Sequence, residues 1–164
     1  MLLSGFPRVS LAHLPTRLEF LPRLTEHLGG PEIWIKRDDM TGLAAGGNKT
    51  RKLEFLVADA LAQGADTLIT CGAVQSNHCR LTLAAAVKEG LKCRLVLEER
   101  VPGSYNPEAS GNNFLFRLLG VEKIEVVPGG SDMDVAMQKT ADALAIESLG
   151  DLKDPKIAAV FDRN

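Results

Sequence analysis

The residues best suited to covalent chemistry lie at positions 44–52, which read Ala-Ala-Gly-Gly-Asn-Lys-Thr-Arg-Lys. The paired glycines let the backbone come close to a bound group. Asn48 suits the N-cap of a helix that begins directly after it. Lys49 then lies in the first helical turn, where the helix dipole and two neighbouring cations favour the uncharged amine. Such an amine attacks carbonyl groups, so Lys49 is a candidate nucleophile.

Two other interpretations of this loop are possible. A lysine after a glycine turn is most often simply solvated. The spacing of Gly42 and Gly47 matches the G-x-x-x-x-G of a P-loop, but Asn48 stands where the phosphate-binding lysine belongs. No later strand ends in a magnesium-binding aspartate, so nucleotide hydrolysis is disfavoured.

A second loop with reactive side chains reads Gln-Ser-Asn-His at residues 75–78. It follows an apolar run and precedes a helical pattern, so Ser76 or Asn77 could act only as a helix cap. A hydroxyl and an amide at that place could also contact a ligand. Metal binding by Cys71, His78 and Cys79 is disfavoured, because adjacent residues on a helix point apart.

Composition narrows the class of protein. The 164 residues suffice for one domain with a substantial core, and the formal net charge is −2. The basic residues are dispersed, which argues against a nucleic-acid partner, and no apolar run is long enough to span a membrane. The three cysteines lack C-x-x-C spacing, which predicts free thiols in a reducing cytoplasm.

The elements that position the two loops alternate between strands and helices. We predict strands at about 33–35, 67–71, 93–98 and 123–127, and helices at about 19–27, from 49 to the glycine at 64, 79–89, 112–119 and 132–149. This order predicts an α/β fold, an open parallel sheet with helices on both faces. Ligands bind beyond the carboxyl ends of such strands, which places residues 75–78 at the active edge. The charged residues 36–39 either end a strand at a polar turn or brace the glycine loop that follows.

Three segments together resemble a known family: Ile-Lys-Arg-Asp-Asp at 35–39, Gly-Gly-Asn-Lys-Thr-Arg-Lys-Leu-Glu at 46–54 and Gln-Ser-Asn-His at 75–78. They are similar to the D-cysteine desulfhydrase and 1-aminocyclopropane-1-carboxylate deaminase family, pyridoxal-phosphate enzymes of the tryptophan-synthase-β fold type, known as fold type II. The similarity runs from about residue 6 to 130. It implies that Lys49 forms the Schiff base and that Asn77 donates a hydrogen bond to the cofactor's ring oxygen. It also implies that Ser76 faces the substrate carboxylate or assists proton transfer, and that Lys52 lies near the phosphate.

The resemblance implies a lyase for a small β-substituted amino acid, first of all D-cysteine, which would give pyruvate, sulfide and ammonia. His78 in the last place of the second loop is closer to the desulfhydrase branch than to the deaminase. Residues 29–35 and 41–44 also resemble L-cysteate sulfo-lyases, so the substrate stays open. A hypothesis of a different class is a non-catalytic α/β module derived from such an enzyme.

The family's chains are about twice as long as this one, and their second half supplies the glycine-rich phosphate cup. We therefore expect an N-terminal part of the large domain at 1–51, a small α/β domain at 52–150 and a divergent tail at 151–164. We also expect a homo-oligomer, most simply a dimer, or a missing C-terminal half. By itself the chain is expected to be a poor catalyst.

Overall fold

A parallel four-stranded sheet forms the centre of the protein in the computed structural model, which describes residues 3–149 and 156–160. The strand order is β5-β4-β3-β6. The strands are β3 (Thr67–Ala73), β4 (Lys92–Glu99), β5 (Lys123–Pro128) and β6 (Ile157–Val160), and every pair of neighbours runs parallel. The α/β fold class predicted from the sequence is confirmed.

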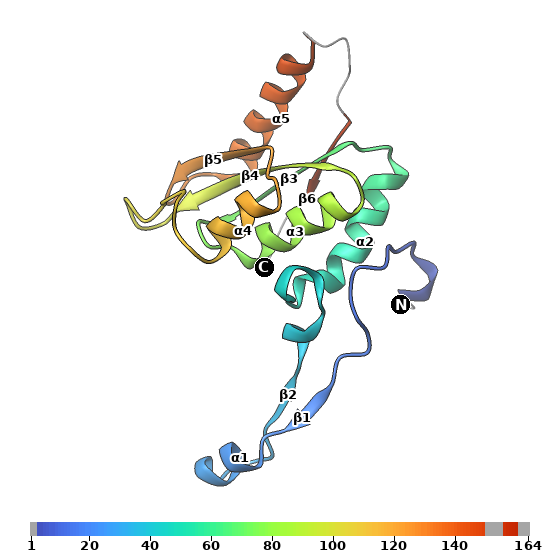
Figure 1. The fold of residues 1–164 in the computed structure, drawn as a ribbon, viewed down its shortest axis with the longest axis vertical. Helices are drawn as coiled ribbons and strands as arrows, with labels where there is room; N and C mark the ends of the chain where they lie inside the picture. Colours follow the sequence, from blue (N-terminus) through green and yellow to red (C-terminus); the bar gives the residue numbers. More distant parts are fainter. Residues whose placement is uncertain (1–2, 150–155, 161–164) are drawn as a thin grey trace.

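Helices cover both faces of this sheet. Successive side chains of each strand point to opposite faces, and the apolar side chains on both faces are buried beneath helices. The helices are α2 (Lys49–Ala62), α3 (Asn77–Lys88), α4 (Asn112–Leu118) and α5 (Met133–Leu149). Leu68 and Leu95 join a core with residues of α2, α3 and α4. Ile69 and Val96, each one position further along, pack instead with Met137 of α5. In Figure 1, α3 and α4 lie on one side of the sheet and α5 lies on the other.

A small antiparallel ribbon projects away from the sheet (Figure 1). It consists of β1 (Leu18–Phe20) and β2 (Trp34–Lys36), joined through α1 (Pro22–Leu28). The predicted helix at 19–27 is therefore wrong at its start. Phe20 pairs with Trp34 across the ribbon, with 5.0 Å between ring centroids, and Pro22 occupies the first helical position.

Two other boundaries differ from those predicted. Strand β3 continues through Gly72 and Ala73, which pair with Leu97 and Glu98, although the sequence predicted a strand that ends at residue 71. Helix α3 begins at Asn77 and not at Cys79, because Ser76 already serves as its N-cap. Three short 3-10 turns complete the chain before α2: η1 (Leu3–Gly5), η2 (Asp38–Met40) and η3 (Leu43–Ala45).

Strand β6 was not predicted at all. Its four residues pair with β3, with Ile157 opposite Thr67, inside the region expected to be a divergent tail. The rest of that tail, residues 151–155 and 161–164, lies outside the described residues. Within residues 3–149 and 156–160, no helix combines the length and the apolar character that a membrane crossing requires.

Candidate active site

The loop before Lys49 requires glycine at two positions. Gly46 has φ 73° and ψ 177°, a conformation that is essentially restricted to glycine. A Cβ atom on Gly46 would lie 1.9 Å from the carbonyl oxygen of Asp39. A Cβ atom on Gly47, which has φ 145°, would lie 2.8 Å from the Cδ1 atom of Leu81 on α3. The two glycines thus let the loop pass tightly between residue 39 and helix α3.

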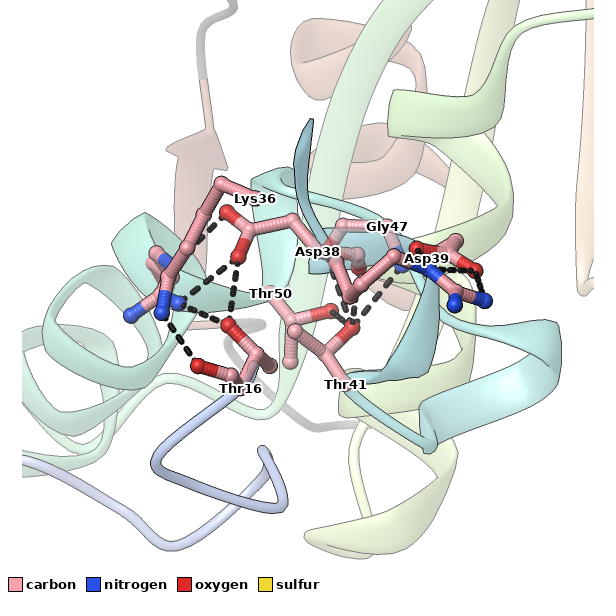
Figure 2. Close-up of polar contacts among 9 residues, drawn as sticks. Thr16, Lys36, Asp38, Asp39, Thr41, Gly47 and Thr50 are labelled. Carbon is pink, nitrogen blue, oxygen red and sulfur yellow. Dashed lines mark hydrogen bonds and ion pairs between the residues drawn. The ribbon is translucent and has the colours of Figure 1, made fainter. Parts of the chain in front are cut away.

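Thr41 holds this loop from within (Figure 2). Its fully buried hydroxyl oxygen accepts the Gly47 N–H at 2.8 Å and lies 3.0 Å from the Gly47 carbonyl oxygen. The same hydroxyl lies 3.3 Å from the hydroxyl of Thr50 in the first turn of α2. Asn48 occupies the N-cap position of α2 as predicted, but its side chain makes no capping hydrogen bond because its backbone is already helical. Thr41 therefore fixes the loop at the start of the helix.

Asp38 braces the same helical turn through Arg51. Its carboxylate accepts hydrogen bonds from Arg51 Nε and Nη2 at 2.8 and 2.7 Å, and from the Thr16 hydroxyl at 2.9 Å. The Arg51 hydrogen bonds lower the pKa of Asp38 to about 2. Figure 2 shows Asp38 and Thr16 side by side at this contact. The acidic residues after β2 thus support the loop and helix that carry Lys49, which favours the bracing interpretation of residues 36–39.

Ser76 forms the N-cap of α3. Its hydroxyl oxygen accepts the Cys79 N–H at 3.2 Å, so the capping role considered from the sequence is confirmed. A Cβ atom on Gly72 would lie 2.4 Å from this hydroxyl oxygen. Ser76 therefore lies directly against the carboxyl end of β3, the edge at which parallel sheets bind ligands.

Asn77, the first residue of α3, has its amide held in one orientation. Its Oδ1 atom accepts hydrogen bonds from Arg80 Nη1 at 2.9 Å and from Asn112 Nδ2 at 3.0 Å. Because both donors occupy the oxygen, the amide N–H groups of this exposed residue point away from them. Within the described part of the chain these N–H groups have no hydrogen-bond partner, which suits a ligand oxygen as acceptor.

Arg80 joins the asparagine loop to the lysine loop. Its Nη2 atom donates to the Gly46 carbonyl at 2.7 Å, while Nη1 donates to Asn77 and, at 2.8 Å, to Asn112 Oδ1. The residue is only 8% exposed, and this burial lowers the pKa of the guanidinium. Sequence reasoning missed Arg80 and Asn112. The available signal was the spacing of Asn77 and Arg80, which places both on one helix face.

The two predicted lysines lie on the first turns of α2. Lys49 is the first residue of the helix, Lys52 follows three positions later, and both are half-buried. Helix α2 packs against α3, whose first turn carries Asn77. The structure therefore brings the Lys49 loop next to the loop with Ser76 and Asn77. The roles of the four residues stay predictions.

Comparisons with known proteins show which proteins this chain is similar to. The family model described as "Pyridoxal-phosphate dependent enzyme" matches residues 9–159. The D-cysteine desulfhydrases of Salmonella paratyphi C and Salmonella newport are each 52% identical over 140 residues, which is 85% of this chain and 42% of theirs. A crystal structure of an ACC deaminase homologue superposes with a TM-score of 0.75 at 39% identity, covering 96% of this chain and 45% of that one. The chain thus spans less than half the length of the curated relatives it matches.

Proposed function

This chain belongs to the family of pyridoxal-phosphate dependent enzymes, and we propose that it is the lysine-bearing part of a lyase that acts on D-cysteine. The resemblance found in the sequence is confirmed by the desulfhydrase relatives and by the ACC deaminase homologue. The observation that carries the proposal is the contact made by Arg80. It joins the Gly46 carbonyl, three residues before Lys49, to the side chain of Asn77.

The side chains at this edge of the sheet fit pyridoxal phosphate. A primary amine on a glycine loop can attach an aldehyde covalently, and an outward amide N–H can donate to a ring oxygen. When bound, this cofactor supplies a ring that accepts the electrons released at the α-carbon of an amino acid. Lys49 would hold the cofactor and afterwards use its released amine to move the α-proton.

The other predicted residues would act around that pair. Asn77 would donate to the ring oxygen, and Ser76 would face the substrate carboxylate or assist proton transfer while its oxygen still accepts the cap N–H. Lys52, one turn further along α2, would lie near the phosphate. Because Ser76 donates through its own hydrogen and accepts through its oxygen, the two roles are compatible.

D-cysteine is the substrate that the similarities favour. The curated relatives that are 52% identical are D-cysteine desulfhydrases, whereas the ACC deaminase homologue is 39% identical. Cleavage of D-cysteine would consume one water molecule and release pyruvate, sulfide and ammonia. L-cysteate sulfo-lyase and ACC deaminase activity are the alternatives, and a non-catalytic module is the alternative of a different class.

Other chain segments would complete the site. We propose that residues 1–51 belong to a large domain, that 52–150 form the small domain, and that the phosphate cup comes from further sequence or from a second copy in a cytoplasmic oligomer. Exposed apolar residues on the ribbon support a missing neighbour, since Leu18 is 60% and Trp34 49% exposed.

The test measures the 2-oxo acid released in the presence of pyridoxal phosphate. This product is pyruvate from D-cysteine or L-cysteate, and 2-oxobutanoate from 1-aminocyclopropane-1-carboxylate. Two proteins are compared: the 164-residue chain, and the same chain continued after residue 150 by the remaining sequence of a D-cysteine desulfhydrase. We expect D-cysteine turnover only in the longer protein, at an ordinary rate of about 1–10³ s⁻¹. A preference of the longer protein for another substrate would favour the corresponding alternative. Cofactor binding with no turnover of any substrate would favour the non-catalytic module.

A further inference from the structure

The buried guanidinium of Arg80 reaches three oxygens that belong to three separate segments. These are the carbonyl of Gly46 before α2, the side chain of Asn77 at the start of α3, and the side chain of Asn112 at the start of α4. Only the planar fork of an arginine offers donors on two nitrogens at fixed angles to such a set. A lysine at position 80 would place a single nitrogen there.

We propose that Arg80 is a positioning residue that orients the amide of Asn77 toward the ligand and fixes the loop carrying Lys49. For the cofactor as that ligand, this inference rests on the function proposed above. Arg80 occupies the oxygen of Asn77, so the asparagine can turn only its N–H groups outward. By donating to the Gly46 carbonyl, the Arg80 side chain also fixes the backbone conformation of the loop that leads to Lys49.

The surroundings of Arg80 are unusual for a purely structural buried cation. Its hydrogen-bond acceptors are all uncharged oxygens, no carboxylate in the described part of the chain pairs with it, and its buried Nε has no partner there. Burying an arginine without a counter-ion costs stability. Its positive charge also polarises the Asn77 amide, which makes the outward N–H groups better donors to an anionic oxygen.

Arg94 provides a matched structural comparison within the same chain. It is also buried, with a side chain 5% exposed, but it pairs with Glu122 at 2.9 Å and Glu147 at 2.6 Å. It lies on β4 and contacts α5, on the other side of the sheet from α3. A conservative Arg94→Lys change therefore reports what the loss of a buried guanidinium does to the fold alone.

The first measurement concerns the chain without cofactor. Side-chain NMR couplings of Asn77 should show a single rotamer in the unaltered chain and in Arg94→Lys, and averaging over rotamers in Arg80→Lys. If Asn77 keeps its single rotamer in Arg80→Lys, the proposal is refuted. If Arg80→Lys does not fold, the unaltered chain decides: separate signals from Nη1 and Nη2 of Arg80 support the proposal, and one averaged signal overturns it.

The second measurement concerns the cofactor. The fraction of Lys49 that borohydride fixes as a pyridoxyl adduct is titrated against pyridoxal phosphate concentration. Because Arg80→Lys loses a charged hydrogen bond to Asn77, the pyridoxal phosphate concentration at half-saturation should rise about tenfold in this variant. In Arg94→Lys it should stay within about twofold of the value for the unaltered chain. Equal shifts in the two variants would contradict the part of the proposal that concerns the cofactor. If the unaltered 164-residue chain acquires no label, the titration is made on the longer protein, which supplies the phosphate cup. If that protein also acquires no label, the proposed function fails, and the NMR result decides the positioning role by itself.

Discussion

The loop before Lys49 depends on a close approach that a single methyl group would prevent. In Gly46→Ala, the new Cβ atom would lie 1.9 Å from the Asp39 carbonyl oxygen, in a backbone conformation with φ 73° and ψ 177°. Gly90, which follows α3, offers a matched control. It has nearly the same φ, 76°, but an added Cβ atom would meet no atom within 4 Å. The two substitutions thus share a positive φ and differ in the contact.

The expected decrease in the free energy of unfolding caused by Gly46→Ala has two parts. Holding alanine in a region of φ and ψ that only glycine tolerates costs about 1–3 kcal/mol. Displacing the packed backbone around Asp39 costs about 1–3 kcal/mol more. Gly90→Ala pays only for the left-handed conformation, about 1–2 kcal/mol. We therefore expect a difference of about 1–4 kcal/mol, against a total stability of about 5–15 kcal/mol for an ordinary domain.

Urea unfolding of the unaltered chain, Gly46→Ala and Gly90→Ala measures this difference directly. With a slope of about 1–3 kcal/mol per molar urea, the unfolding midpoint of Gly46→Ala should lie about 1 M below that of Gly90→Ala. The same change should shift the carbonyl that Arg80 binds and reduce cofactor labelling at Lys49. Equal midpoints for the two variants would refute the close approach of residues 39 and 46.

Three further changes test other contacts. The pKa of Asp38 is lowered to about 2, so the stability that its carboxylate contributes is present above about pH 4 and is lost as the pH falls toward 2. Asp38→Asn should therefore lower the free energy of urea unfolding by about 1 kcal/mol at pH 7, after allowance for solvent screening, and by almost nothing at pH 2. A loss that is the same at both pH values would contradict this. Ser76→Ala should lower the free energy of unfolding by about 0.5–2 kcal/mol as a lost cap but reduce turnover of the longer protein, continued after residue 150, far more. Unchanged turnover would leave Ser76 as a cap alone. The buried carboxylate of Glu54 accepts hydrogen bonds from the N–H groups of Leu11 and Ala12 and forms an ion pair with Arg8. Glu54→Gln should therefore lower the free energy of unfolding by about 2 kcal/mol and expose the segment before α2 to limited proteolysis. An unchanged cleavage pattern would argue that these contacts do not hold the segment in place.

The sequence predicted the alternating part of the fold well because the signals there are local. From Lys49 onward, apolar residues repeat with helical or strand spacing, and glycines at the helix ends adopt positive φ, as Gly64 and Gly120 do. The order of strands and helices then leaves a parallel sheet as the simplest arrangement.

The elements that sequence reasoning missed are short or depend on distant partners. Residues 18–20 form a strand only because residues 34–36 return beside them, and β6 has only four residues. Arg80 was missed for the same reason. Its partners Gly46 and Asn112 lie 34 and 32 positions away in the chain, and no local pattern indicates that they meet.

The proposed site depends above all on covalent attachment of pyridoxal phosphate to Lys49. Its most direct test is borohydride reduction of the chain incubated with pyridoxal phosphate, followed by peptide mapping, with Lys49→Ala as the control. We predict one pyridoxyl-modified peptide that carries the label on Lys49. In Lys49→Ala, both this label and the absorbance of the Schiff base before reduction should be lost. A label on Lys36 or Lys52 instead, or equal labelling of Lys49→Ala, would contradict the claim.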